Sequence, residues 1–147
     1  MRGLSYITAL LCGASLACTV ESEDPAFAIV PAITLDAQSA TEVTAFADTL
    51  RLTLSYQDGD GDLGGLDGDS RLYVHDSRLP APDAFDLRSF TPNGEALSIE
   101  GTLDVVLGPY FLLGNAGEEV IDLELWITDR AGHESNRVFA DEIRVLR

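Results

Sequence analysis

The chain has 147 residues, with 25 acidic residues against nine basic ones and a formal net charge of −16 at neutral pH. Every basic residue is an arginine. So negative a surface repels nucleic acid and anionic membrane surfaces, which argues against both as partners, and it suits cations and basic proteins. An acidic, lysine-free composition is also typical of adaptation to salt, so solvation remains an alternative explanation for part of the charge.

The first residues have the pattern of a secretory signal. Arg2 precedes an apolar segment, 4–17, which is too short to span a bilayer and ends in small residues. The sequence Ser-Leu-Ala-Cys at 15–18 resembles the lipobox of bacterial lipoproteins, in which the cysteine becomes the lipidated first residue. We therefore expect residues 1–18 to be a lipoprotein signal peptide ending at Cys18, which would carry the lipid. A plain signal peptide cut near Ala17 is the alternative.

This interpretation leaves no thiol for a disulfide, a zinc site or a nucleophile, because Cys12 leaves with the signal. The remaining 129 residues suffice for one domain with a core. We expect an acidic tether at 19–26 and a β-sandwich domain at 27–147. Acidic residues just after a lipidated cysteine also resemble a signal that places lipoproteins on the outer face of the outer membrane. The predicted location is therefore exported and lipid-anchored in the outer membrane, and the acidic tether favours the cell surface without fixing the face.

From Phe27 onward apolar and polar residues alternate, as in half-buried strands. The pattern predicts an edge strand broken at Pro31, followed by a connection at 36–48 with room for a helical turn. Later in the chain, residues 109–113 form an apolar run. That run is expected to cap the core or, alternatively, to form an exposed contact patch. Further strands are expected at 50–56, 71–75, 87–90, 99–107, 121–127 and 137–146, separated by loops that include 76–86, a turn at 92–94 and 129–136.

About seven strands with turn signals between them predict an all-β fold, an antiparallel β-sandwich. The alternation also predicts which side chains face its core. These are Leu50, Leu52, Leu54, Tyr56, Ile99, Gly101, Leu103, Val105, Leu107, Ile121, Leu123, Leu125, Ile127, Phe139, Ile143 and Val145.

The loop at 58–69 contains five carboxylates and five glycines and no cation. Hard cations such as Ca²⁺ prefer six to eight oxygen ligands. Asp58, Asp60 and Asp62 match the first half of an EF-hand loop, and Asp69 falls at its twelfth place. Leu63 stands where the sharp-turn glycine belongs, however, and strands should flank the loop, so an EF-hand is excluded. We expect a calcium loop on a β scaffold.

Two motifs carry a resemblance. Tyr-Gln-Asp-Gly-Asp-Gly-Asp-Leu-Gly at 56–64 and Thr-Asp-Arg-Ala-Gly-His-Glu-Ser-Asn at 128–136 resemble a set of short, mostly uncharacterised bacterial surface lipoproteins. Those proteins pair a DGDGDLG loop with a D-x-A-G-N-x-S-N loop, and His133 stands where the pattern usually has asparagine. The resemblance implies an immunoglobulin-like fold and an anchored location, but no established activity.

In an immunoglobulin-like sandwich the acidic loop is the B–C loop and residues 129–136 form the F–G loop, at the same pole. Asp129, with Glu134 or the Asn136 amide, would then complete a metal shell begun by the first three aspartates. The alternative is a hydrated acidic loop in which Asp129 only caps its own turn. Under the first interpretation the metal ligands are Asp58, Asp60, Asp62, Asp69, Asp129 and Asn136.

No pattern favours an enzyme, since Ser135 lacks the strand–turn–helix elbow of a serine hydrolase. The predicted function is a surface-anchored binding or adhesion module with a structural Ca²⁺ and an unknown protein or glycan ligand. Trp126, expected to point outward, is the predicted partner contact; its alternative role is to cover a sheet face or pack against an arginine. The second hypothesis is an accessory subunit of an envelope complex, without metal, that docks through residues 110–113.

Overall fold

The computed structural model describes residues 26–65, 68–91 and 97–147. Within these ranges the chain forms ten strands, and no helix is long and apolar enough to cross a membrane. Cys18, the rest of the expected signal, most of the tether and the turn at 92–94 lie outside the described residues. The strands are β1 (Ala32–Gln38), β2 (Glu42–Thr44), β3 (Leu50–Asp58), β4 (Arg71–Asp76), β5 (Asp83–Asp86), β6 (Ile99–Leu107), β7 (Glu118–Ile121), β8 (Leu123–Thr128), β9 (Val138–Phe139) and β10 (Ile143–Leu146).

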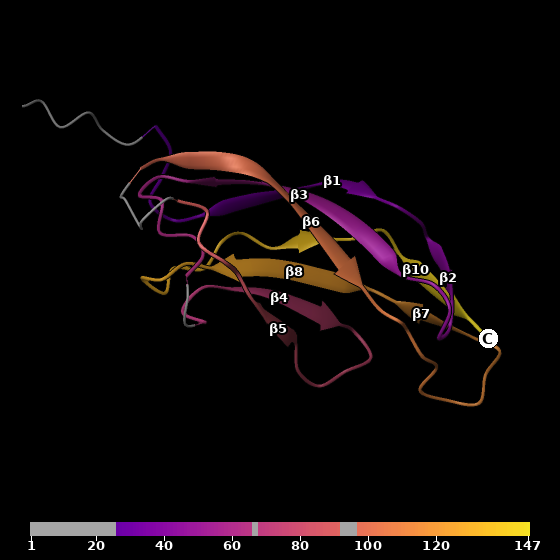
Figure 1. Ribbon diagram of the computed structural model, residues 1–147. Helices are drawn as coiled ribbons and strands as arrows, with labels where there is room; N and C mark the ends of the chain where they lie inside the picture. Colours follow the sequence, from indigo (N-terminus) through magenta and orange to yellow (C-terminus); the bar gives the residue numbers. More distant parts are fainter. Residues whose placement is uncertain (1–25, 66–67, 92–96) are drawn as a thin grey trace, which may run out of the picture.

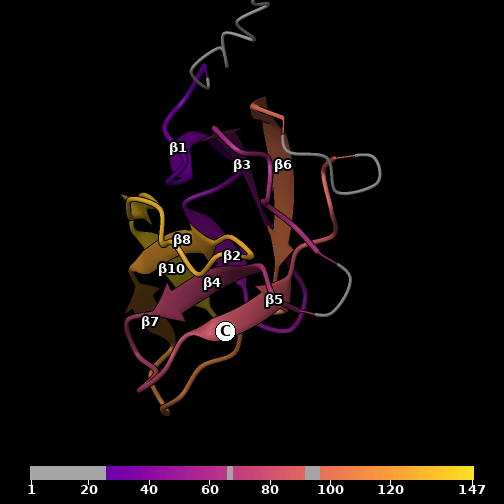
Figure 2. The same cartoon turned by 90° about the vertical axis from the view of Figure 1, so that its left-hand side faces the viewer.

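These strands pack as two layers, with β1, β3 and β6 above β4, β5 and β8 (Figures 1 and 2). One sheet has the order β1-β3-β6, the second β5-β4-β8-β9, and a third, short sheet has the order β2-β10-β7. All described pairs are antiparallel except β2 with β10. The predicted antiparallel β-sandwich is therefore confirmed, although the number of strands is ten rather than seven.

The strand order is that of an immunoglobulin-like sandwich. In that fold strands A, B and E share one sheet, and C′, C, F and G share the other. Here β1, β3 and β6 correspond to A, B and E, and β5, β4, β8 and β9 correspond to C′, C, F and G. The loop between β3 and β4 is thus the B–C loop, and the loop between β8 and β9 is the F–G loop.

The core lies between the layers and consists of the inward-facing rows of the long strands. Leu50, Leu52 and Leu54 of β3 are at most 1% exposed, and the odd-numbered positions of residues 121–127 are equally buried. Apolar side chains that face each other across two sheets leave water together, which is the main favourable contribution to folding. The predicted rows of β3, β6 and β8 are confirmed.

The second half of the predicted loop at 76–86 contains a strand, because β5 pairs with β4 along all four of its residues. Residues 87–90 are not a strand; Leu87 and Phe90 instead pack against the core as irregular chain. The predicted connection at 36–48 contains β2, which pairs with β10 at the far end of the chain. A strand of three residues is too short to show an alternating pattern in the sequence, and its partner lies about 100 residues away, so the prediction missed it.

The last predicted strand, 137–146, is two strands in different sheets: β9 pairs with β8, and β10 with β2 and β7. Between them the Asp141 N–H donates to the Gln38 side-chain oxygen at 2.8 Å. This break shifts the alternation, so Ile143 and Val145 are buried as predicted whereas Phe139 is 65% exposed and its predicted core position is wrong.

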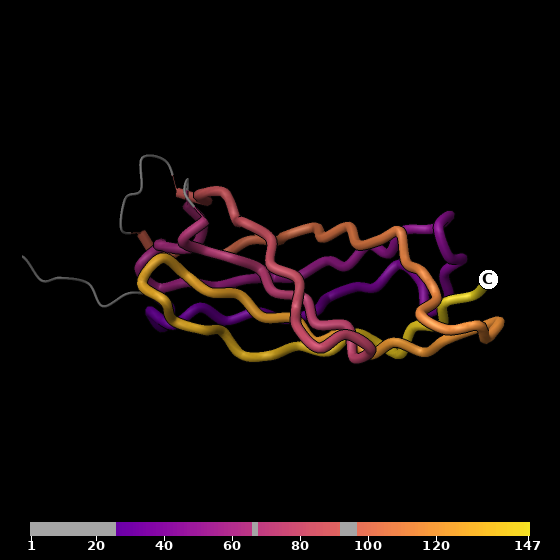
Figure 3. The backbone as a smooth tube through the Cα atoms, turned by 90° about the horizontal axis from the view of Figure 1, so that it is seen from below, coloured from indigo at the N-terminus to yellow at the C-terminus, as the bar shows by residue number. Residues whose placement is uncertain are grey.

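The first strand begins only after Pro31, at Ala32, and β1 is an edge strand as predicted. Residues 26–31 are not part of it, and Ile29 is exposed. They lie at the same end of the sandwich as the acidic loop, where the Gly59 N–H donates to the Ala28 carbonyl at 2.8 Å. The C terminus lies at the opposite end (Figures 1 and 3).

The apolar run at 109–113 caps the core with alternate residues, and its role as a contact patch stays a prediction. Tyr110 is buried in the core and Leu112 packs against it. Phe111 and Leu113 are exposed. Alternate residues of this segment therefore cap the core and face solvent.

Candidate metal centre

Two aspartates occupy core-facing positions at the ends of central strands. Asp58 follows Leu54 and Tyr56 on the inward row of β3, and Asp129 follows Ile127 on the inward row of β8. Both carboxylates are 0% exposed. Because the two strands end at the same pole, the fold buries two ionisable groups there, at a cost that only specific partners can offset.

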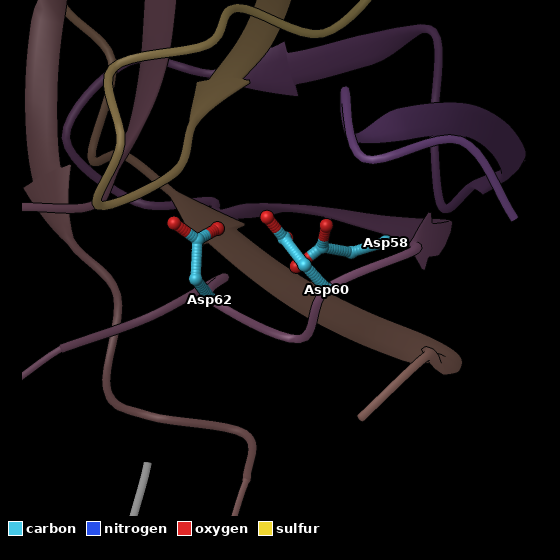
Figure 4. Close-up of side chains that lie close together, drawn as sticks. All are labelled: Asp58, Asp60 and Asp62. Carbon is cyan, nitrogen blue, oxygen red and sulfur yellow. The ribbon is translucent and has the colours of Figure 1, made fainter. Parts of the chain in front are cut away.

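Asp58, Asp60 and Asp62 form a cluster in which one carboxylate oxygen of each lies within 4.8 Å of the other two. The alternation of aspartate and glycine brings them to one side of the loop. Figure 4 shows the Asp58 side chain directed toward Asp60, with Asp62 farther along the loop, where it reaches the Ala131 N–H of the loop between β8 and β9. Two oxygens that each lie about 2.4 Å from one Ca²⁺ can be at most about 4.8 Å apart, so this spacing fits a shared ion.

The cluster contains buried oxygens without hydrogen-bond partners. Asp58 Oδ2 accepts a hydrogen bond from the Leu63 N–H at 2.9 Å, which fixes the turn of the loop. Asp58 Oδ1, Asp60 Oδ1 and Asp62 Oδ1 have no partner among the described residues. Buried polar atoms nearly always have a partner, which is a protein group, an ordered water or an ion, so three such oxygens in one cluster mark it as a candidate site.

The electrostatics of the cluster favour either protonation or a cation. Burial, with a further contribution from the negative charges of Asp60 and Asp62, raises the pKa of Asp58 to about 6. Burial followed by the charges of Asp129 and Asp60 also raises the pKa of Asp62. Two like charges within 4.8 Å of each other repel by at least about 3 kcal/mol at an effective dielectric constant of about 20.

The raised pKa of Asp58 links folding to pH. Because the folded state binds this proton more tightly than the unfolded chain, whose aspartates titrate near pH 4, ionised Asp58 destabilises the metal-free fold. The stability contributed by its proton is present below about pH 4 and is lost as the pH rises to about 6.

The two loops meet, as predicted. Asp62 Oδ2 accepts a hydrogen bond from the Ala131 N–H at 3.0 Å, and the Asp62 carbonyl accepts one from the Arg130 N–H at 3.4 Å. Ser70, fully buried, adds a second link: its hydroxyl donates to the Thr128 carbonyl at 2.7 Å and accepts from the Gly64 N–H at 2.8 Å. The acidic loop is thereby held against the end of β8.

Asp129 is not one of the clustered ligands, which corrects its predicted role. Asp129 Oδ1 accepts the His133 N–H, and Asp129 Oδ2 lies 2.8 Å from His133 Nδ1. This contact and the charge of Asp129 raise the pKa of His133. Both Asp129 oxygens are therefore paired within the F–G loop, as expected for an aspartate that caps its own turn.

Asn136 also has a structural role instead of the predicted ligand role. Its Oδ1 accepts the Ile33 N–H at 2.9 Å, and its Nδ2 donates to the Ile33 carbonyl at 2.8 Å. The amide thus occupies the open edge of β1 as a neighbouring strand would, and its oxygen is engaged there by the Ile33 N–H. Asp69 is exposed and lies outside the cluster, so its EF-hand-like spacing does not bring it to the metal position.

Glycines allow other backbone segments to press against the acidic loop. A side chain at Gly59 would meet the Phe27 carbonyl oxygen at 2.2 Å, and one at Gly61 would meet the Leu97 carbonyl oxygen at 2.1 Å. At Gly64 the φ angle is +80° and the Arg88 carbonyl oxygen lies 2.0 Å from the position of a Cβ. Gly59 and Gly61 alternate with the three aspartates because another backbone segment packs directly against each glycine and leaves no room for a side chain.

Trp126 points away from the core, as predicted, but it is covered. Its ring stacks on Tyr73 with centroids 5.1 Å apart, and the Arg137 guanidinium carbon lies 3.7 Å from the ring centre. Only 8% of Trp126 is exposed. Its alternative role, packing on the sheet against an arginine, is what this structure shows, and a partner contact there would require Arg137 to move.

Sequence reasoning missed Ser70 and the pairing of His133 with Asp129. The sequence does indicate that Asp58 and Asp129 are buried. Inward-facing residues recur at every second position of β3 and β8, and the next position in each series is one of these aspartates. Ser70 has no such indication: its partners, Gly64 and Thr128, are defined only once the two loops are placed together.

The cluster offers carboxylate oxygens and no sulfur or imidazole, a donor set that suits Ca²⁺ and argues against zinc or copper. Comparisons with protein-family models, with curated proteins and with solved structures found no match. The resemblance to surface lipoproteins therefore stays a prediction.

A pair of glycine substitutions tests how tightly the acidic loop is packed. Gly64→Ala should lower the free energy of unfolding by about 3 kcal/mol or more, because backbone strain adds to a clash with the Arg88 carbonyl. Gly132→Ala, where φ is +88° with no atom within 4 Å, should cost about 1 kcal/mol from strain alone. Urea denaturation in EDTA measures both. Equal losses would contradict the close packing at Gly64.

Proposed function

We propose that this chain is an exported, lipid-anchored, non-catalytic binding module whose immunoglobulin-like domain is stabilised by one Ca²⁺ at the acidic pole. The observation that carries the metal proposal is the fully buried Asp58, whose Oδ1 has no partner among the described residues and whose carboxylate clusters with those of Asp60 and Asp62. A divalent cation there would turn mutual repulsion into attraction.

Calcium is preferred to magnesium because three carboxylates converge on one position. Mg²⁺ usually keeps several waters and takes one or two carboxylates, whereas Ca²⁺ accepts a larger and more flexible oxygen shell. Asp58, Asp60 and Asp62 would supply the protein ligands. The role is structural, since the same loop also holds the F–G loop through Asp62 and the N-terminal segment through Gly59.

The described residues support a non-catalytic function. The Asp129–His133 pair has a serine two residues later, but the Ser135 hydroxyl donates to the Asn136 carbonyl and accepts the Ile127 N–H. It is therefore committed to the backbone and not positioned as a nucleophile for His133.

If the metal proposal holds, Ca²⁺ should stabilise the wild type but not Asp58→Asn, whereas without metal the variant should be the more stable of the two. In EDTA at pH 7, Asp58→Asn should be more stable, by up to about 3 kcal/mol, because it removes a buried charge yet keeps an oxygen for the Leu63 N–H. In millimolar Ca²⁺, at fixed ionic strength, the wild type should gain several degrees in Tm and the variant none.

Asp69→Asn is the matched control, since it removes the same charge from an exposed position of the same loop. It should keep the full response to Ca²⁺. If the wild type shows no Ca²⁺-dependent rise in Tm, or if Asp58→Asn responds equally, the metal proposal fails.

The lipid anchor is tested separately. Cys18→Ser, expressed in a bacterium with lipoprotein-processing enzymes, should move the chain from the membrane fraction to the soluble exported fraction, because the thiol that would carry the lipid is gone. Cys12→Ser should leave the distribution unchanged. Membrane association that survives Cys18→Ser would contradict lipidation at this residue.

A second candidate is an accessory subunit of an envelope complex, without metal. Phe111 and Leu113, exposed next to the buried Tyr110, are the observation behind it, because a docked partner would cover apolar side chains that now face solvent. A melting temperature that does not respond to Ca²⁺ would favour this candidate.

A further inference from the structure

A cavity of about 220 Å³ lies between the two layers, where β5 and β6 flank it. Its walls are of mixed polarity: they include the core residues Val74, Leu107 and Leu123 together with the charged residues Asp76, Arg78 and Asp83. Sites for whole small molecules are usually about 300–1,000 Å³, so this cavity suits a single inserted side chain. Three of its lining side chains are also exposed to solvent: Phe85, Val106 and Phe111.

Both flanking strands are edge strands among the described residues. β6 ends the order β1-β3-β6, and β5 ends the order β5-β4-β8-β9. The two lie on the same side of the sandwich (Figure 2). An edge strand presents backbone N–H and C=O groups with which an extended peptide can pair, while a neighbouring pocket selects one of its side chains.

The cavity contains a buried polar atom without a partner. Tyr110 lines it and is 8% exposed, and its hydroxyl makes no hydrogen bond with any described residue. Burial and the charge of Asp76 raise the pKa of Tyr110 to about 12, so the hydroxyl keeps its proton at neutral pH and can donate it. The neighbouring Arg78 is already bound to Asp76 and Glu119, which leaves Tyr110 as the group available to a ligand.

Charge identifies the kind of occupant. Asp83 of β5 lines the cavity, and the chain as a whole has a net charge of −16. Asp104 of β6, two residues before Val106, is paired with Arg51 at 3.6 Å, so Asp83 and the net charge carry the attraction. A second copy of the chain would bring a like-charged surface to this place, and residues 19–25 carry three acidic residues and no basic one. Like charges placed opposite each other disfavour both occupants, whereas a basic segment is attracted and steered.

We propose that the cavity between β5 and β6 binds an extended, basic segment of a protein partner, which pairs with the free strand edges and inserts one side chain against Tyr110. The inference rests on the proposed binding role and names its surface and its partner class. It does not depend on the metal, whose centre is built by the loop between β3 and β4.

A displayed library of random nine-residue peptides is the probe. It is selected on the full chain in Ca²⁺, with Val106→Arg as the counter-target and Val120→Arg as the matched control, since both valines are about half exposed and only Val106 lines the cavity. Enriched peptides should carry lysine or arginine around one large apolar or aromatic residue. They should bind the wild type and Val120→Arg equally, and Val106→Arg at least tenfold more weakly.

Tyr110→Phe, which keeps the ring and removes the hydroxyl, should weaken the same peptides by about twofold to tenfold. The proposal is overturned if no peptide is enriched, if enriched peptides are acidic, or if they bind Val106→Arg as well as the wild type. Sedimentation that shows a dimer lost in Val106→Arg would overturn it in favour of a second copy. The Ca²⁺ melting experiment tests the acidic loop and the peptide selection tests the cavity between β5 and β6, so one proposal can fail while the other holds.

Discussion

The burial of Asp58 is the constraint on which the acidic pole depends. The alternation that puts Leu50, Leu52 and Leu54 into the core carries the same row onward to a carboxylate that is 0% exposed. One of its oxygens holds the Leu63 N–H, and the other has no partner among the described residues. An ionised group so placed costs several kcal/mol unless a proton or a cation joins it.

The second buried aspartate shows the other solution to the same problem. Asp129 ends the inward row of β8, yet both of its oxygens are paired with His133, from the backbone and from the ring. Asp129 therefore closes the F–G loop within itself, whereas Asp58, Asp60 and Asp62 are the residues that would hold the proposed ion. Asp62 joins the two loops through the Ala131 N–H.

The sequence predicts what depends on local alternation and turn chemistry, and little of what depends on distant partners. The rows of β3, β6 and β8 follow from period two, and their order as a sandwich brings the two motif loops together. Asn136 looked like a metal ligand because its amide is a suitable donor, but it pairs with Ile33, 103 residues away in sequence. The short β2 and the split between β9 and β10 likewise arise from pairing with distant strands, which no local pattern records.

Equilibrium dialysis with ⁴⁵Ca²⁺ against the wild-type chain and Asp58→Asn, at physiological ionic strength, measures whether the buried Asp58 holds a cation. We expect one specifically bound ion per wild-type chain, with a Kd of about 10⁻⁴–10⁻³ M as in extracellular calcium modules, and no specific binding to the variant. Absence of specific binding to the wild type, or an equal stoichiometry in both proteins, would contradict the metal proposal.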